Sequence, residues 1–217
     1  MPKTEIIPCT REEIDKILEA AINDDFFYLL FKVARKTGRR LGEYYGEPEM
    51  KTVAIRKWRD KAGNIVKTKQ IKKTTGKWVG GVQVKDIDYD RKVMMTQVLK
   101  RRQKVYKEAL LDDDLIYLIR KYVAKEKLKL DDYLFRKVGY RQIQNRIVSY
   151  AKKAKIPHKV SFHNFRHYFI TELSKKGYSH SDIAKLTGHS TVGVIASYDH
   201  TIASDIRDRA IKDITDM

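Results

Sequence analysis

The sequence predicts an α+β fold that is mainly α-helical and carries a small antiparallel β-sheet. Apolar residues recur at helical spacing over most of the chain, in segments bounded by capping residues and glycines. Alternating, strand-like stretches are confined to the interval from about residue 47 to about residue 110. The length of 217 residues and the hydrophobic fraction of 42% suit one packed domain.

The first helices are marked by their ends. Thr10 and Glu13 form a capping-box pattern, which predicts an amphipathic helix directly after it. A second helix is expected over DFFYLLFKVARK and ends near Gly38, because glycine readily supplies the C-terminal cap. The stretch RRLGEYY then predicts a short third helix.

Residues 47–81 differ from the rest of the chain. They hold both tryptophans, Trp58 and Trp78, and ten Lys or Arg residues with few acids. The turn sequence DKAGN separates two extended stretches, so we expect a basic β-hairpin or an extended arm.

This arm has two interpretations. Its bases could track DNA phosphates while a tryptophan stacks on a sugar or base. Alternatively, its lysines could keep an exposed sheet edge from aggregating. We favour the DNA interpretation, under which the candidate contacts are Arg56, Lys57, Arg59, Lys72 and Lys73.

The remaining elements fall into two groups. Strands are expected around GVQVKDID and KVMMTQVL, with a third from QKVYKEAL. Helices are expected from there to the C-terminus, in the stretches DDDLIYLIRKYVAKEK, YRQIQNRIVSYAKKAK, HNFRHYFITELSKK, DIAKLT and a last one that carries Tyr198.

The charge balance indicates a polyanionic partner. Lys and Arg number 46 against 28 Asp and Glu, a formal net charge of +18, and the pI is about 9.8. Such an excess favours nucleic acid, because bound cations release its counterions, whereas solubility alone needs less charge. A membrane surface is the weaker alternative, since no apolar run can span a bilayer and no basic helix has a bulky apolar face.

Cysteine usage bears on the compartment. Cys9 is the only cysteine, so no disulfide can form within the chain, which suits a reducing compartment. The start MPKTEIIPCT lacks the apolar segment of a secretory signal. We therefore expect a cytoplasmic protein, with the nucleus as the alternative.

Four short motifs carry the functional signal. TGRRLGE opens a helix and places an acid one turn after its second arginine. His163 and Arg166 stand three apart in HNFR, so both can grip one anion from the same helix face. LTGH lies at a turn between helices, and Tyr198 follows nine residues after its histidine.

In this order, TGRRLGE, HNFR, LTGH and the tyrosine of SYDH resemble the signature of the tyrosine recombinase, or phage integrase, family. Each motif is weak alone, but the ordered set is specific. The resemblance runs from about Thr10 to the C-terminus, apart from the arm, and implies the catalytic domain of that family. The family usually has an N-terminal DNA-clamping domain as well. Here residues 1–217 are expected to form the catalytic domain alone, with a basic β-rich insertion at about 47–81.

The resemblance implies that DNA is cleaved and rejoined through a 3′-phosphotyrosyl bond to Tyr198. Arg40 and Arg166 would clamp the non-bridging oxygens of the scissile phosphate, because a guanidinium offers a fixed fork of donors at permanent charge. His163 would accept the tyrosine proton, since a phenol with its ordinary pKa of about 10 resists ionisation. His189 would hydrogen-bond the phosphate.

Further residues receive supporting roles from the resemblance. The family protonates the leaving 5′-oxygen with a lysine of a β-hairpin, and Lys100 fits that place, with Lys104 as the reserve. Glu43 is expected to orient the arginine of its motif, and His167 to pack beside the site. His163 and His167 are four apart and could instead hold a metal, but no third ligand is evident. We expect neither a metal nor a cofactor.

Three functions compete. The first is site-specific recombination, most simply the integration or excision of a mobile element. Four copies would act on two double-stranded attachment-type sites, in the host cell of that element or of a virus. The second is DNA relaxation by a type IB topoisomerase, which the integrase form of LTGH and its tyrosine spacing disfavour. The third is a DNA-binding module without catalysis. It has no need of the whole set of Arg40, His163, Arg166, His189 and Tyr198.

Overall fold

The computed structural model describes residues 7–99 and 105–189. Within those residues, helices build most of the molecule. They are α1 (Arg11–Ala20), α2 (Asp25–Thr37), α3 (Leu41–Tyr45), α4 (Asp113–Glu126), α5 (Tyr140–Lys153), α6 (His163–Lys175) and α7 (His180–Thr187). None of these helices is long and apolar enough to cross a membrane.

Two antiparallel sheets accompany the helices in the described residues. One has the strand order β3 (Ile87–Asp88), β4 (Val93–Val98) and β5 (Val105–Leu110), and the 3₁₀ turn η1 (Val84–Asp86) precedes it. The other is a hairpin of β1 (Glu47–Arg59) and β2 (Ile65–Val79). The prediction of a mainly helical α+β fold with a small antiparallel sheet is therefore confirmed.

Local signals set the ends of the N-terminal helices. The Thr10 hydroxyl accepts a hydrogen bond from the Glu13 amide, and the Glu13 carboxylate accepts one from the Thr10 amide, so the predicted capping box is present. Asp24 caps the start of α2, and Gly38 ends that helix in the left-handed region with a φ of 60°. The TGRRLGE segment therefore begins at the C-terminal end of α2.

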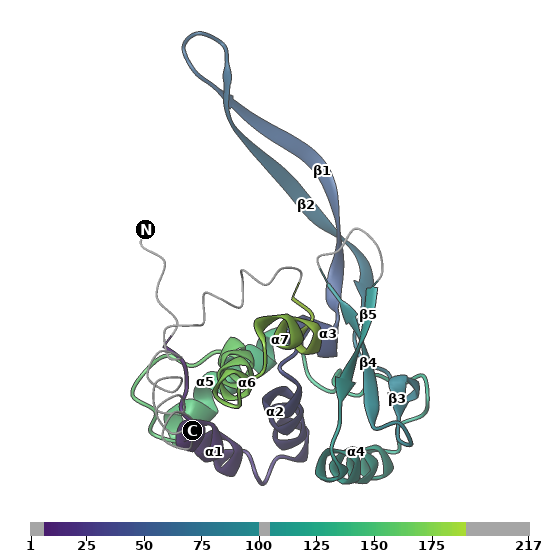
Figure 1. Ribbon diagram of the computed structural model, residues 1–217. Coiled ribbons are helices and arrows are strands. Elements are labelled where there is room, and N and C mark those ends of the chain that lie inside the picture. Colours follow the sequence, from purple (N-terminus) through teal and green to yellow (C-terminus); the bar gives the residue numbers. More distant parts are fainter. Residues whose placement is uncertain (1–6, 100–104, 190–217) are drawn as a thin grey trace.

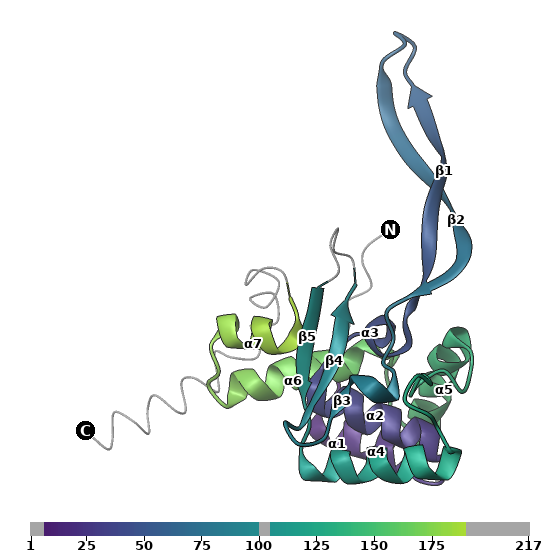
Figure 2. The same ribbon diagram turned by 90° about the vertical axis from the view of Figure 1, so that its right-hand side faces the viewer.

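Helix α2 lies at the centre of the helical body, where it packs against α1, α4 and α6 (Figure 2). Its buried side carries Phe27 and Phe31, and Phe31 stacks on Phe165 of α6 with ring centroids 5.3 Å apart. Burial of each ring contributes about 2–3 kcal/mol, so this contact holds α2 and α6 in a fixed relation. The relation matters because α2 ends, and α6 begins, at candidate site residues.

One predicted strand is wrong in its extent. Of the stretch GVQVKDID, only Ile87–Asp88 forms a strand, and η1 comes before it. The Val82 amide donates to a carbonyl of α3, while the Gln83 amide donates to the Asp86 carboxylate at 2.8 Å. The Gln83 amide thus bonds to a nearby side chain and not to a neighbouring strand, although the alternating pattern had suggested a strand here.

The β1–β2 hairpin stands away from the body of the molecule (Figure 1). Its residues are exposed along nearly the whole of both strands, apart from half-buried Trp58 and the two ends at Glu47 and Val79. The hairpin expected in this region is thus formed, but most of it packs against nothing in the described part of the chain.

Candidate active site

The glycine of TGRRLGE shapes the first part of the site. A Cβ on Gly38 would lie 2.4 Å from the Phe169 ring, and its φ of 60° already disfavours a side chain. The Gly38 carbonyl accepts a hydrogen bond from the Arg166 guanidinium at 3.0 Å. The turn of the first motif is therefore joined directly to the arginine of HNFR.

Thr37 and Tyr44 brace the same turn. The Thr37 hydroxyl donates to the Val33 carbonyl at 2.8 Å, so the Tyr44 hydroxyl is the donor in their contact at 2.6 Å. The Tyr44 oxygen in turn accepts from the Arg39 amide at 3.0 Å. Burial raises the pKa of Tyr44, which keeps the phenol protonated for this role. These bonds were missed at the sequence level, because Tyr44 lies just outside the TGRRLGE motif.

Arg40 is the N-cap residue of α3 and is held by Glu43. The Glu43 carboxylate, whose side chain is 0% exposed, accepts from the Arg40 amide at 3.0 Å and from its guanidinium at 3.2 Å. The Arg40 side chain keeps 32% of its surface exposed. Glu43 therefore orients Arg40 while leaving part of the guanidinium open to an anion.

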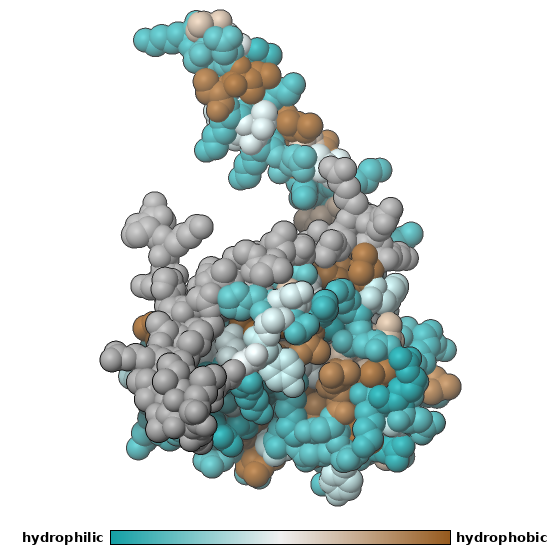
Figure 3. Space-filling model, viewed as in Figure 1, coloured by the Kyte–Doolittle hydropathy of each residue, from teal (hydrophilic) through white to brown (hydrophobic). Residues whose placement is uncertain are grey.

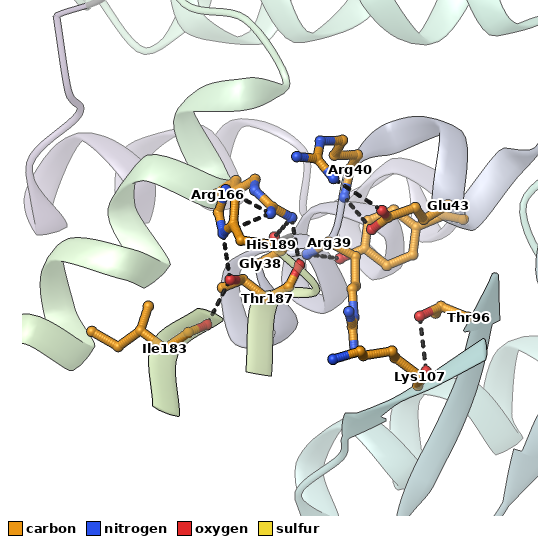
Figure 4. Close-up of polar contacts among 11 residues, drawn as sticks. Gly38, Arg39, Arg40, Glu43, Thr96, Lys107, Arg166, Ile183, Thr187 and His189 are labelled. Carbon is orange, nitrogen blue, oxygen red and sulfur yellow. Dashed lines mark hydrogen bonds and ion pairs between the residues drawn. The ribbon is translucent and has the colours of Figure 1, made fainter. Parts of the chain in front are cut away.

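Arg166 connects three motifs that are distant in sequence. It is only 1% exposed. Its Nη1 donates to the Gly38 carbonyl at 3.0 Å and to the Thr187 carbonyl at 2.8 Å, and its Nη2 lies 2.9 Å from Nε2 of His189 (Figure 4). TGRRLGE, HNFR and LTGH thus converge on one buried guanidinium.

Hydrogen bonding assigns the tautomer of His189. The Thr187 hydroxyl donates to the Ile183 carbonyl at 2.6 Å, so its oxygen accepts from Nδ1 of His189 at 2.7 Å. Nε2 is then the acceptor for Nη2 of Arg166. Burial, followed by repulsion from Arg166 and Arg40, lowers the pKa of His189 to about 3. The imidazole is therefore neutral at physiological pH.

A cavity of about 550 Å³ opens beside these residues. His163 lines it, together with several charged side chains. Its cationic lining residues are Arg39, Arg40, Lys159 and Arg166, and its acidic lining residue is Glu47. Lys159 was missed at the sequence level, because it belongs to no motif and its only signal is its place shortly before HNFR. The excess of cations makes the cavity an anion site by charge.

Arg39 is the first arginine of TGRRLGE and received no role from the sequence, yet it is 1% exposed. Its Nη2 donates to the Glu108 carbonyl at 2.7 Å, whereas Nε and Nη1 have no hydrogen-bond partner in the described part of the chain. A Cβ on Gly188 would lie 2.5 Å from Nη1, and the φ of 74° at Gly188 already disfavours a side chain. Burial lowers the pKa of Arg39. Figure 4 shows Arg39 and Arg40 pointing in different directions from the same turn.

His163 and His167 lie one turn apart on α6, with ring centroids 4.7 Å apart. Burial, and then the charge of Arg166, lowers the pKa of His167. His163 lines the cavity, and His167 packs behind it with a disfavoured charge. Neither histidine belongs to a cluster of three close metal-ligand side chains within the described ranges.

One group of side chains in residues 7–99 and 105–189 could hold a metal, and it does not line the cavity. Ligand atoms of Cys9, Glu13 and His158 lie within 4.8 Å of one another. The Glu13 carboxylate is already bonded to the Thr10 amide at 2.9 Å and to Nε2 of His158 at 3.1 Å. The first of these bonds belongs to the capping box of α1, and the second ties Glu13 to a distant loop.

Three predicted site residues, Lys100, Lys104 and Tyr198, lie outside the described residues. The structure gathers the other main candidates at one place: Arg40, His163 and Arg166 line the cavity, and His189 joins them through Arg166. The candidate arm contacts Arg56, Lys57, Arg59, Lys72 and Lys73 all lie on the hairpin or at its turn, and none lines the cavity.

Relatives place these features in a family. Residues 79–204, more than half of the chain, match the model of the phage integrase family. The virulence plasmid integrase pGP8-D of Chlamydia trachomatis is 40% identical over 68 residues, which are 31% of this chain and 21% of that protein. The tyrosine recombinase XerA of Saccharolobus solfataricus is 28% identical over 131 residues, 60% of this chain and 43% of that protein. The chain thus aligns with less than half the length of these curated relatives.

Solved structures agree on the fold. A crystal structure of XerA recombinase matches with a TM-score of 0.68 at 20% identity, over 98% of this chain and 65% of that chain. The Tn1549 transposon integrase in complex with transposon right end DNA matches with a TM-score of 0.64 at 14% identity, over 97% of this chain and 67% of that chain. With the ordered motifs, the family match and this shared fold, the chain belongs to the phage integrase family of tyrosine recombinases.

Proposed function

We propose that this chain is the catalytic part of a site-specific DNA recombinase, which cleaves and rejoins DNA through a 3′-phosphotyrosyl bond to Tyr198. The observation that carries the proposal is the convergence of Arg40, His163, Arg166 and His189 at one cationic cavity. Similarity to an integrase and to a tyrosine recombinase supports DNA as the substrate.

A phosphodiester fits this cavity by charge. Attack on phosphorus places additional negative charge on the non-bridging oxygens, and preorganised guanidinium donors stabilise that charge. Arg166 is preorganised because two backbone carbonyls hold it in place. Arg40, anchored at one end by Glu43 and partly exposed at the other, is the second half of the clamp.

His189 supplies a contact that responds to the substrate. Its Nε2 accepts from Arg166 in the free protein, so it has no proton to give there. Burial is the main cause of the low pKa of His189, and a bound phosphate would offset the next cause, the positive charges of Arg166 and Arg40. Protonation, or a change of tautomer, then lets Nε2 donate to a phosphate oxygen.

The remaining roles belong to proton transfer. His163, at the cavity wall, is the proposed acceptor of the Tyr198 proton. Lys100, with Lys104 as the reserve, is the proposed donor to the leaving 5′-oxygen. The phosphotyrosine ester retains the energy of the broken linkage, so a 5′-hydroxyl can reverse the step without a nucleotide cofactor. His167 supports His163 from behind.

The proposal extends to partners and place. The substrate is double-stranded DNA of the attachment type, and four copies act on two duplexes to integrate or excise a mobile element. The site of action is the cytoplasm of the host cell of that element or of a virus. Residues 1–217 act as the catalytic domain, with the hairpin region at 47–81 as an insertion.

A nicked suicide DNA substrate tests this function, because its short cleaved end diffuses away and traps the covalent complex. A library of candidate attachment sequences is incubated with the protein at low salt without divalent metal, and adducts are resolved on a denaturing gel. We expect an adduct that disappears in Tyr198→Phe. Tyr117→Phe is the matched control, since Tyr117 is 63% exposed on α4.

Other outcomes would assign another function. A folded protein that binds DNA tightly yet gives no adduct on any sequence would favour a binding module without catalysis. Adducts at many unrelated sequences, together with relaxation of supercoiled DNA, would favour a topoisomerase.

A further inference from the structure

The β1–β2 hairpin is the largest feature that the proposed chemistry does not use. Its strands are 13 and 15 residues long, so it reaches about 40 Å from the body at the usual rise per residue. Figure 3 shows it as a mainly hydrophilic projection that stands clear of the rest of the molecule. A long, exposed, two-stranded ribbon is only marginally stable by itself, so contact with a binding partner would stabilise it.

The register of the hairpin separates its two faces. Strand β2 runs without a bulge from Lys67 to Thr74, so successive side chains alternate between the faces. One face carries the β2 residues Lys67, Lys69, Ile71 and Lys73, and the other carries Thr68, Gln70, Lys72 and Thr74. Three of the four lysines of this stretch therefore lie on one side.

Strand β1 adds cations to the same side. Residues paired directly across an antiparallel ribbon share a face. Lys51 pairs with Lys73, and Arg56 pairs with Lys69. We call this side the basic face; its members are Lys51, Arg56, Trp58, Lys67, Lys69 and Lys73.

The opposite face is much less charged, and it carries two of the five residues that the sequence offered as DNA contacts. Lys57 pairs with Thr68, and Lys72 pairs with Thr52, so both lie opposite the basic face. Arg59 is at the turn, where its guanidinium donates to the Gly63 carbonyl at 2.6 Å. Lysines that merely guarded a sheet edge would have no reason to gather on one side.

The cations of the basic face form no ion pair with another residue that the structure describes. The ion pairs formed within residues 7–99 and 105–189 include no hairpin residue. The nearby acids are engaged elsewhere: Glu49 accepts from the Thr75 hydroxyl at 2.6 Å, and Asp60 accepts from the Asn64 amide at 2.8 Å. Two pairs of like charges directly opposite each other destabilise the isolated ribbon, and an external polyanion would remove that cost.

The two tryptophans have different surroundings. Trp78, at the base of the hairpin, packs edge-on against Tyr45 at 5.3 Å and lies 5.4 Å from the Arg136 guanidinium. It anchors the ribbon to the body. Trp58, near the far end, lies on the basic face between Arg56 at 5.3 Å and Lys67 at 5.5 Å. An aromatic ring among cations suits a sugar–phosphate surface.

We propose that the basic face of the hairpin is a second DNA-binding site, which grips the phosphates of duplex DNA away from the cavity. This site rests on the proposed action on DNA and gives the hairpin a part in that action. The contacts are to backbone charge, so they contribute affinity and orientation and little sequence preference. A two-stranded β-ribbon is one of the elements that a duplex groove accommodates.

Two double variants with equal loss of charge test the face. Lys69→Gln with Lys73→Gln removes two charges from the basic face, and Lys57→Gln with Lys72→Gln removes two from the opposite face. Both are made in the Tyr198→Phe background, so binding is measured without cleavage. With a random-sequence duplex, we expect the first pair to reduce the slope of log affinity against log salt by about 1.8, because each phosphate contact contributes about 0.9. The second pair should leave the slope unchanged.

The opposite results are equally clear. Equal effects of the two double variants, or an unchanged slope for Lys69→Gln with Lys73→Gln, would overturn the proposal. Binding of polyglutamate that depends on the basic face, with DNA binding unaffected, would instead assign an acidic protein as the partner. Circular dichroism and thermal unfolding check that both variants fold. The adduct assay uses the protein that retains Tyr198, and its result does not depend on the binding measurement. A failure of the proposed function and a failure of this second site are therefore distinguishable.

Discussion

The cavity and the basic face of the hairpin present the same kind of side chain in opposite settings. Arg166 is 1% exposed, and two carbonyls and a histidine aim its donors. Lys69 and Lys73 are exposed and lie directly opposite other cations. The first cation acts at one fixed point, whereas the others act on any anion within about 10 Å, the range that salt screening allows.

This difference separates geometry from affinity. A buried cation interacts strongly with a transition state but costs folding free energy unless hydrogen bonds satisfy it. An exposed cation costs little, and salt screens its interactions. Changes in the cavity should therefore alter rate and stability, and changes on the hairpin should alter affinity and its salt dependence.

Among changes to the cationic side chains of the two regions, Arg166→Lys is expected to have the largest effect. A lysine cannot donate in two fixed directions, so cleavage should fall by about 10²–10³-fold. The rate of adduct formation on the suicide substrate measures the loss. Arg141→Lys, on the exposed side of α5, is the control and should keep the parental rate. A parental rate in Arg166→Lys would mean that the buried fork does not orient the phosphate.

His189 should make stability depend on pH. Its pKa is about 3 in the fold against 6.5 ordinarily, so below pH 6.5 the unfolded chain binds a proton that the folded chain excludes. The contribution of neutral His189 to the free energy of unfolding is fully present above pH 6.5. It declines as the pH falls towards 3, by up to about 1.4 kcal/mol per pH unit. Relative to His189→Asn, the parental protein should lose about 2 kcal/mol between pH 7 and pH 5 in urea unfolding. A constant difference between the two proteins would contradict the burial of a neutral imidazole.

Replacing Arg39 should have a smaller effect, and it should raise the stability of the fold. Its guanidinium is buried, and two of its nitrogens lack hydrogen-bond partners among the described residues. Arg39→Met keeps the bulk and removes the charge, so the free energy of unfolding should rise by roughly 1 kcal/mol, after loss of the bond to the Glu108 carbonyl. Urea denaturation measures it, with Arg141→Met as the exposed control. A lower midpoint for Arg39→Met would show that the buried charge stabilises the fold.

The smallest effect concerns the hairpin without DNA. Lys73 lies directly opposite Lys51, so Lys73→Glu turns a pair of like charges into a pair of opposite charges. This change should slow amide hydrogen exchange in β1 and β2 by a few-fold. Lys72→Glu, which pairs with Thr52 on the opposite face, should change exchange less. Equal protection in both variants would mean that the pairing register does not concentrate repulsion on the basic face.

The sequence by itself determined the parts of the site whose signals are local. Thr10 and Gly38 mark helix ends through residues within four positions of each, and the structure has those caps. HNFR places two functional side chains at helical spacing, and LTGH places a functional histidine directly after a glycine turn. Because such signals depend on nearby backbone alone, the order of the motifs predicted the family before any long-range contact was known.

The tertiary structure decided what spacing cannot express. Arg166 meets the Gly38 carbonyl across 128 positions of sequence, and neither the burial of Arg39 nor the place of Lys159 at the cavity follows from a motif. On the hairpin, strict alternation along β1 would put Lys51 and Arg56 on opposite faces. The register shift between Thr52 and Ala54 puts both on the basic face. One additional residue in a strand reverses the side that every later residue occupies, and only the pairing with the neighbouring strand reveals where that residue is.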